Sequence, residues 1–214
     1  MGPVELHPTY PVRTARLELR PLTGADADDL IAYRALEEVS RYVPFEPMSP
    51  ARIAEKLEGG WSRRTITAEG EALTLGVELG ETGKVIGDLM LFFRSAEHHS
   101  GEVGWVFHPD CAGHGYATEA AHALLHLAFD DLGLHRVIAR VDARNDASLR
   151  LCDRLGMRRE ALLVANEWFK GAWSDEVDFA LLEGEWAAQH AGGPGSCRWP
   201  LVGDGAALRA RGAR

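Results

Sequence analysis

The chain has 214 residues, of which 46% are hydrophobic and 26% charged, and its 23 Lys and Arg against 32 Asp and Glu give a formal net charge of −9. The apolar content is too high for an intrinsically disordered protein, and the length is ample for one domain with a sizeable core. The acidic balance argues against a nucleic-acid binder that depends on phosphate contacts, and no apolar run approaches the roughly 20 residues of a membrane-spanning helix.

The N-terminus and the cysteines favour a cytoplasmic protein. Residues 1–7 lack the basic and apolar segments of a secretory signal. Cys111, Cys152 and Cys197 are few, odd in number and without CxxC spacing, so they indicate neither a disulfide framework nor a zinc site. We therefore expect a cytoplasmic protein without a bound metal.

Apolar residues alternate or recur at helical spacing along most of the chain, and this predicts an ordered series of elements. In chain order these are a strand at 16–20, helices at 26–36 and 50–59, strands at 73–79 and 85–93 joined by a turn at 81–84, a strand at 102–107, a helix at 117–132, a strand at 136–141, a helix at 147–155, and strands at 161–169 and 176–182. Such mixing predicts an α/β or α+β sheet with a helical crossover.

The helix at 117–132 carries the clearest signals. Its small and apolar side chains form one stripe, and Gly133 ends it. His122 and His126 are four residues apart, and they lie outside the centre of that stripe. We interpret them as part of a solvated polar face rather than as half of a metal site, because no Glu follows the first His as it does in zinc proteases.

The composition changes after Trp186. Residues 187–214 contain six Gly, seven Ala and two Pro, with four Arg against one Asp. We expect one domain over residues 1–186 and a basic Gly/Ala-rich tail over 187–214. The composition favours a disordered tail over one that lies against the acidic body.

Gly113 and Gly115 stand between a predicted strand and a predicted helix, in the segment Ala112-Gly113-His114-Gly115-Tyr116-Ala117-Thr118. The first turn of a helix leaves N–H groups without partners, and its dipole favours an anion. Glycines would let a phosphate approach those groups. A diphosphate cradle and a purely structural turn both stay open at this point. No Gly-Lys-Ser/Thr follows, so this is not a Walker loop, and it lacks the third Gly of a dinucleotide fingerprint.

A second segment narrows this choice. About thirty residues later the chain reads Asn145-Asp146-Ala147-Ser148, and then Leu155-Gly156-Met157. Together with Gly113 to Ala120, this pattern resembles the GNAT superfamily of acyl-CoA-dependent N-acetyltransferases, over roughly residues 12–186. The segments 16–22 and 178–182 resemble its RimJ/RimL-like branch. The resemblance implies a mixed, mostly antiparallel sheet with splayed central parallel strands and helices on both faces.

The resemblance also implies a site for acetyl-CoA. In this family the diphosphate rests on the Gly-rich loop, and the pantetheine arm lies along the preceding strand and beside the Asn-x-x-Ser segment. The matching positions are Trp105, Val106, Phe107, Ala112, Gly113, His114, Gly115, Tyr116, Ala117, Thr118, Asn145 and Ser148. Two positions depart from the family pattern. Ala112 replaces the usual Gln or Arg, and Cys152 occupies the place where many relatives have a general-acid Tyr.

Acetyl transfer to an amine requires removal of a proton from the ammonium, stabilisation of an oxyanion and help for the leaving thiolate. Glu102 is our first candidate for the base, and a solvated strand-end carboxylate is the alternative. A backbone N–H near Val106 would serve the oxyanion. Ser148 would protonate the thiolate or bind the pantetheine, or is only a helix-start serine. We do not expect Cys152 to act as a nucleophile, because no His lies near it in sequence.

Contacts to the acceptor are less clear from the sequence. The resemblance implies that they come from the segment with Tyr42, Phe45 and Glu46 and from a hairpin with Trp168, Trp173 and Asp175. Either carboxylate, Glu46 or Asp175, would attract a cationic amine, and ordinary loop packing explains the same residues.

We expect direct attack by a primary amine in a ternary complex with acetyl-CoA, the amine belonging to a protein N-terminus or a small molecule. A homodimer is in keeping with the branch. One alternative is a CoA-binding regulatory module without turnover, and another is a transferase of a longer acyl group such as succinyl.

Overall fold

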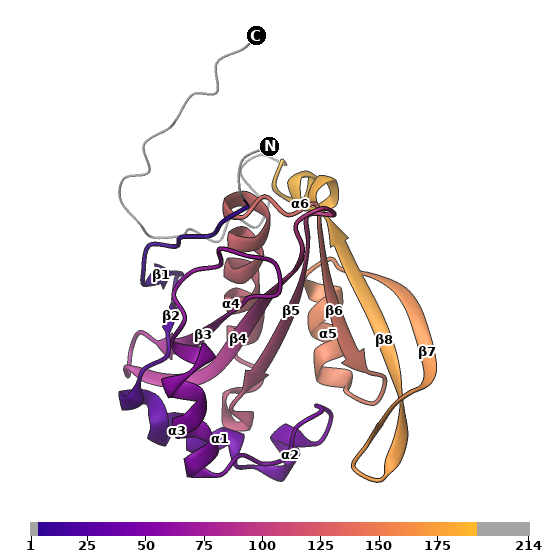
Figure 1. Cartoon of the computed structure of the whole chain (residues 1–214). Helices are drawn as coiled ribbons and strands as arrows, with labels where there is room; N and C mark the ends of the chain where they lie inside the picture. Colours follow the sequence, from indigo (N-terminus) through magenta and orange to yellow (C-terminus); the bar gives the residue numbers. More distant parts are fainter. Residues whose placement is uncertain (1–3, 192–214) are drawn as a thin grey trace.

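A mixed sheet of eight strands organises the protein, whose computed structural model describes residues 4–191 (Figure 1). The strand order is β1-β2-β3-β4-β5-β6-β8-β7. The strands are β1 (Val12–Arg13), β2 (Leu17–Pro21), β3 (Ala72–Leu79), β4 (Lys84–Ser95), β5 (Ser100–Phe107), β6 (Arg136–Asp142), β7 (Arg158–Phe169) and β8 (Ala172–Leu182). Among these strands only β5 and β6 pair in parallel. The expected mixed, mostly antiparallel sheet is therefore confirmed.

The two central parallel strands separate soon after they meet. Ser100 pairs with Arg136 and Glu102 with Ile138, and the β5–β6 pairing ends there. Figure 1 shows the two strands diverging beyond that point. Because β4 covers the other edge of β5 as far as Phe107, the backbone of residues 103–107 is left without a strand partner on the β6 side. This gap is the feature of the sheet that matters most for the site.

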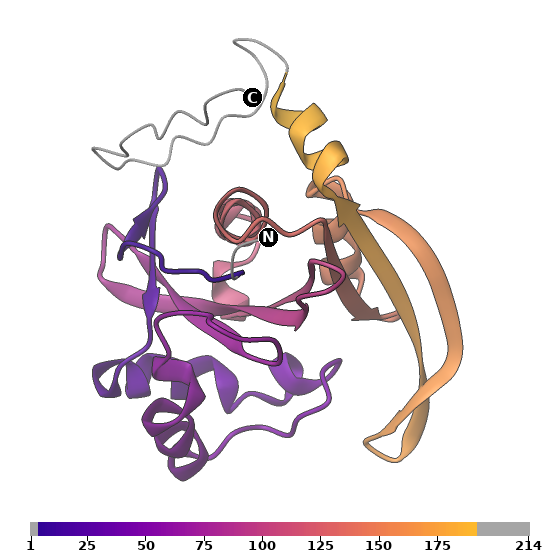
Figure 2. The same cartoon turned by 45° about the horizontal axis from the view of Figure 1, so that its top comes forward.

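Helices lie on both faces of the sheet, as expected. They are α1 (Ala27–Arg34), α2 (Glu37–Ser40), α3 (Pro50–Glu58), α4 (Tyr116–His126), α5 (Asp146–Arg154) and α6 (Glu183–His190). Helices α4 and α5 cover one face, and α1 to α3 lie on the other (Figure 2). The larger apolar core packs under α4, and the smaller one lies between α1, α3 and the sheet. No helix between residues 4 and 191 is long and apolar enough to cross a membrane.

Local sequence signals account for the helix that begins at the crossover. Gly115 is the N-cap of α4 and has a φ of 79°, which a residue with a side chain rarely adopts. The stripe predicted for residues 117–132 is buried against the sheet. The helix does not stay regular to its end, because Leu127–Asp131 forms a π-helical turn in which the Leu132 N–H donates to the Leu127 carbonyl at 2.9 Å.

The largest difference from the sequence analysis lies near the C-terminus. Helix α6 begins after β8 and continues to His190, so residues 187–190 belong to a helix rather than to the expected tail. Residues 192–214, which hold the rest of that tail, lie outside the described residues. The chain also forms β1 and α2, two short elements that periodicity did not predict.

Helix α6 also explains why the prediction for His122 is wrong. His122 is buried, and its ring lies 6.0 Å from that of Trp186 and 6.3 Å from that of His190. His126 packs edge-on against Trp186 at 4.8 Å, and its Nδ1 lies 2.6 Å from Asp130 Oδ2. The two histidines therefore do not form a solvated face, because α6 covers it.

We expect His122 to make the fold sensitive to mild acid. Burial, followed by the charges of His190 and His126, lowers the pKa of His122 from 6.5 to about 4. The folded state thus binds fewer protons than the unfolded state between these values, so stability is present above pH 6.5 and is lost as the pH falls towards 4, by up to about 3 kcal/mol. Urea titrations at several pH values would measure this slope.

The control for this prediction is His122→Leu, which removes the titrating group and keeps the apolar packing. Its free energy of unfolding should change less between pH 6.5 and pH 4 than that of the wild type. Burial raises the pKa of Asp131, which acts in the opposite direction, and the hydrogen bond from His126 lowers the pKa of Asp130 against the effect of burial. Asp130 and Asp131 are present in the wild type and in His122→Leu alike. An equal pH dependence of the free energy of unfolding in the two proteins would therefore contradict the role of His122.

Candidate active site

One groove of about 740 Å³ connects the Gly-rich loop to the gap between β5 and β6. Its lining comes from α2 and the loop after it, the end of β5, the loop 108–115, the first turn of α4, and α5 with the Asn145 that precedes it. Of the twelve positions expected to bind acetyl-CoA, all but His114 line this groove. The two sequence segments that carried the family resemblance, thirty residues apart in the chain, therefore meet in space.

The loop before α4 has the backbone conformation that a diphosphate cradle needs. Gly113 and Gly115 both have positive φ, at 81° and 79°. No heavy atom lies within 4 Å of a Cβ built on Gly113, so the surface of the loop is open there. The N–H groups at the start of α4 have no partner within the helix and carry its positive dipole end. The residues present thus fit a bound diphosphate.

His114 does not line the groove with the rest of the loop. Its side chain is exposed, its Nδ1 lies 3.0 Å from the Ala112 carbonyl oxygen, and its ring stacks on Tyr116 at 5.5 Å. Tyr116 itself faces the groove. The structure thus places the His114 side chain outside the groove, stacked on Tyr116.

Asn145 and Ser148 are joined by the capping of α5. The Asn145 side-chain oxygen accepts a hydrogen bond from the Ser148 N–H at 3.1 Å, which makes Asn145 the N-cap. The Ser148 hydroxyl oxygen accepts a hydrogen bond from Trp105 Nε1 at 3.1 Å. The hydroxyl proton of Ser148 is therefore not used in this contact.

Cys152 is separated from the groove. Its side chain is fully buried, it does not line the groove, and burial followed by the charge of Asp153 raises the pKa of its thiol to about 12. A thiol in this state is a poor nucleophile and a poor acid at neutral pH. The structure thus offers no catalytic role for Cys152 in place of the Tyr that many relatives have there.

Glu102 lies at the last position where β5 pairs with β6, on the sheet face opposite Trp105 and Phe107, and it does not line the groove. Its carboxylate forms an ion pair with Arg94 of β4 and is 21% exposed. Glu176 of β8 is a second carboxyl group in this region and is buried. Burial, followed by the charge of Glu167, raises the pKa of Glu176, and Glu102 adds to this effect. Glu176 could not be identified as a candidate from the sequence, because its burial depends on strand pairing.

The six expected acceptor residues do not form one cluster. Tyr42 lines the groove, whereas Glu46 lines a neighbouring pocket of about 360 Å³. Phe45 packs on the Arg34 guanidinium, whose carbon lies 5.0 Å from the ring centre. Asp175 Oδ1 accepts a hydrogen bond from the Ala165 N–H at 2.8 Å.

Trp168 and Trp173, the remaining two, stand near the tip of the β7–β8 hairpin. They pack edge-on against each other at 5.4 Å, and each is 60% exposed. Of the expected acceptor residues, only Tyr42 is therefore shared with the groove.

The groove also contains charged residues that sequence reasoning missed. Glu38 of α2 is the single carboxylate among its lining residues. Arg150 and Arg154 line it from α5, and Arg154 Nε donates to Thr118 Oγ1 at 3.1 Å. The i, i+4 spacing of the two arginines after Asn145 is a signal that could have indicated them. The groove thus has a basic end near the cradle and one acidic group near α2.

Comparison with known proteins agrees with this geometry. A family profile described as the acetyltransferase (GNAT) domain matches residues 16–158. The chain belongs to the GNAT acetyltransferase family.

Individual relatives and solved structures match over most of this chain. It is 31% identical over 183 residues to the uncharacterised N-acetyltransferase YnaD of Bacillus subtilis, covering 82% of this chain and 98% of that one. It is similar to a GNAT-family acetyltransferase from Bacillus anthracis (TM-score 0.72, 28% identity, 81% and 99% covered). The spermidine N-acetyltransferase of Vibrio cholerae, solved with CoA and spermine, shares the fold (TM-score 0.69, 22% identity, 81% and 99% covered).

Proposed function

We propose that this GNAT acetyltransferase transfers an acetyl group from acetyl-CoA to a primary amine by direct attack in a ternary complex. The observation that carries the proposal is the single groove that joins an anion cradle to the gap between β5 and β6. A donor and an acceptor that enter from the two ends of such a groove would meet at the gap. Holding them there removes much of the entropic cost of the reaction.

The groove suits the two parts of CoA that need different partners. Gly113, Gly115 and the first turn of α4 would hold the diphosphate, with Arg150 and Arg154 adding positive charge at that end. The unpaired backbone of residues 103–107 would bind the amide groups of the pantetheine arm, as an added strand would. When bound, acetyl-CoA supplies the acetyl group as an activated thioester.

Side chains of the protein then accept and donate the protons of the reaction. Glu102 takes the proton from the ammonium, directly or through water, because an unmodified amine is mostly protonated at pH 7. Ser148, whose oxygen already accepts from Trp105, would give its proton to the leaving sulfur and take up the proton that the attacking nitrogen loses as the C–S bond breaks, so that the hydroxyl is restored. A backbone N–H of β5 near Val106 stabilises the charge that develops on the carbonyl oxygen.

Glu38 gives the acceptor end of the groove a negative charge. We expect Glu38→Gln to raise KM for a cationic amine about three- to tenfold, because an exposed carboxylate attracts an ammonium by roughly 1 kcal/mol. The kcat at saturating amine should change little. Steady-state assays with the free thiol as readout would measure both, and Glu37→Gln, on the same helix but outside the groove, is the matched control. An equal rise in KM for both variants would contradict the assignment.

Calorimetric titration with CoA, followed by a free-thiol assay with acetyl-CoA and a panel of amines, tests the proposed function. The panel should contain peptides with free N-termini, the acceptors expected for the RimJ/RimL-like branch. It should also contain polyamines, because the Vibrio cholerae protein is named a spermidine N-acetyltransferase. CoA binding with thiol release for one acceptor class supports the proposal. Binding without release from any acceptor favours a regulatory module, and faster release from succinyl-CoA favours a longer acyl group. No CoA binding would contradict the cradle itself.

Two further expectations accompany this proposal. We propose a cytoplasmic location, which fractionation would test. We also propose a homodimer, in keeping with the RimJ/RimL-like branch, and sedimentation equilibrium would test it.

A further inference from the structure

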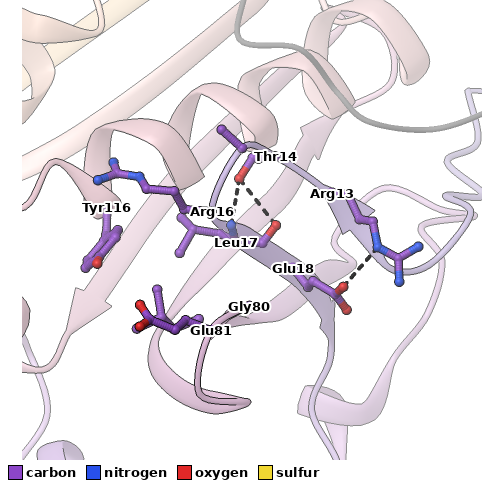
Figure 3. Close-up of a pocket in the computed structure, with 10 residues that line it drawn as sticks. Arg13, Thr14, Arg16, Leu17, Glu18, Gly80, Glu81 and Tyr116 are labelled. Atoms are coloured by element: carbon purple, nitrogen blue, oxygen red, sulfur yellow. Dashed lines mark hydrogen bonds and ion pairs between the residues drawn. The ribbon is translucent and has the colours of Figure 1, made fainter.

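Arg16 connects the N-terminal end of β2 with the back of the diphosphate cradle. Its Nη1 donates to the His114 carbonyl oxygen at 2.9 Å. Its guanidinium carbon lies 4.6 Å from the centre of the Tyr116 ring. Figure 3 shows Arg16 and Tyr116 on one side of a second pocket of about 320 Å³, whose lining shares only Tyr116 with that of the groove. The contact is thus made from behind the cradle and not from the side where a ligand would sit.

The other side of the same guanidinium holds a carboxylate that is completely buried. Glu119, in the first turn of α4, has no exposed side-chain surface. Its Oε2 accepts a hydrogen bond from Arg16 Nε at 2.7 Å. Its Oε1 accepts from the Arg16 backbone N–H at 2.9 Å and from the Thr14 hydroxyl at 2.6 Å. This buried ion pair, together with the hydrogen bond from the Arg16 backbone, holds the guanidinium in one position.

The contact with His114 fixes the direction of a neighbouring N–H. The His114–Gly115 peptide is trans, so its carbonyl and its N–H point in opposite directions. Because the carbonyl points to Arg16, the Gly115 N–H points away from Arg16, and Gly115 lines the groove. Gly residues with positive φ leave a loop free to rotate its peptides unless a contact prevents it.

Arg16 also offsets a charge that would otherwise weaken anion binding. A negative Glu119 one turn below the cradle repels a bound diphosphate, and at short range in a buried setting this repulsion is poorly screened. The guanidinium beside Glu119 neutralises it. The same side chain thus positions a donor and removes an opposing charge.

We propose that Arg16 is a positioning residue for CoA binding, which it supports by clamping the His114–Gly115 peptide and neutralising Glu119. The inference rests on the proposed function, since it assumes that the cradle binds the CoA diphosphate. Arg16 does not itself line the groove, and it contacts Tyr116 and the His114 carbonyl from outside it. Its effect should therefore appear in affinity for the donor and not in the chemical step.

Arg16→Gln should raise the Kd for CoA about tenfold, because a charge-assisted hydrogen bond and a neutralised charge are lost together. The KM for acetyl-CoA should rise by a similar factor, with kcat at saturating donor within about twofold of the wild type. Arg16→Lys keeps the positive charge but cannot form the fork that reaches both Glu119 and His114, so its affinity should stay reduced. Arg13→Gln is the matched control, because Arg13 lines the same pocket, pairs with Glu18 and does not contact the loop.

Calorimetric titrations of the four proteins with CoA, thermal melts without ligand and assays with S-acetylpantetheine complete the test. With S-acetylpantetheine, a donor that lacks the diphosphate, wild type and Arg16→Gln should have the same kcat/KM. A loss with this donor as well, or full affinity for CoA in Arg16→Lys, would overturn the clamping role. An unchanged Kd in Arg16→Gln beside a wild type that binds CoA would overturn the inference alone. A wild type that does not bind CoA would overturn the proposed function and the inference together.

Discussion

Replacing Glu102 by Gln is expected to lower kcat at pH 7 by about 100-fold while the Kd for CoA changes less than twofold. Removal of a positioned general base typically costs 10²- to 10⁴-fold in rate. Glu102 lies where β5 and β6 part, on the face opposite the Trp105 side chain, so its loss does not alter the cradle. Gln keeps the size of the side chain and an oxygen that can accept from Arg94, so the strand geometry should survive. Steady-state assays and calorimetry would measure the two quantities.

Two other carboxylates provide the comparison that makes this test decisive. Glu97→Gln changes the same charge on an exposed turn next to β5 and should leave kcat unchanged. Glu176→Gln removes the buried carboxyl near Glu102 whose pKa burial raises. A carboxyl with a raised pKa is closer to the value that suits a base at neutral pH. If kcat survives in Glu102→Gln and falls in Glu176→Gln, the base is Glu176, and the role proposed for Glu102 is wrong.

Most of the sheet could be predicted from the sequence because its strands carry local signals. The alternating residues of β3 and β4 and the turn at 81–84 specify a hairpin, which the structure contains. The Gly residues before α4 and its apolar stripe predicted the helix start and the buried face. These features depend on neighbours within a few residues. That is why the glycine turn between β5 and α4 was also predictable.

The errors share one physical cause near α4. The sequence after Trp186 is rich in Ala and Gly, so the second half of α6, residues 187–190, was assigned to a tail, and the histidine face of α4 was left without a covering element. In the structure Trp186 is buried, and its Nε1 donates to Asp130 Oδ1 at 3.2 Å. A single apolar residue thus docks a helix that has little periodicity of its own. Tertiary packing of this kind has no local signal.

The proposed acceptor end of the groove was unpredictable for a similar reason. Helix α2, which carries Glu38, has four residues and shows no periodic pattern. Its place beside the groove depends on the packing of the segment between α1 and α3. That packing is built around a buried ion pair, which sequence reasoning did not identify because its two partners lie 54 residues apart.

Removing the carboxylate of that pair should unfold the protein more readily than any exposed substitution. Asp88 of β4 and Arg34 of α1 are 3% and 5% exposed. Asp88 Oδ2 accepts from Arg34 Nε at 3.0 Å and from the Tyr33 hydroxyl at 2.6 Å. Asp88→Ala would leave the guanidinium buried and unpaired, so we expect a loss of about 3–5 kcal/mol in the free energy of unfolding, measured by urea denaturation.

Two further variants separate the ion pair from ordinary packing. Arg52→Ala removes an exposed ion pair with Glu55 and should cost less than about 0.5 kcal/mol. Arg34→Met with Asp88→Val replaces the pair by apolar groups, and it should recover much of the stability lost in Asp88→Ala, because no buried charge is left unpaired. A loss below about 1 kcal/mol in Asp88→Ala would show that water reaches Arg34.

The same pair links stability to the proposed acceptor end of the groove. The Arg34 guanidinium lies between two aromatic rings, 5.0 Å from Phe45 and 4.9 Å from Trp61. Phe45 follows Tyr42 and Val43, which line the groove. If Asp88→Ala frees Arg34, the segment that holds Tyr42 loses its anchor. The KM for the amine should therefore rise in Asp88→Ala under conditions where the protein is still folded. The Kd for CoA, set by the cradle on the other side of the gap, should stay close to that of the wild type.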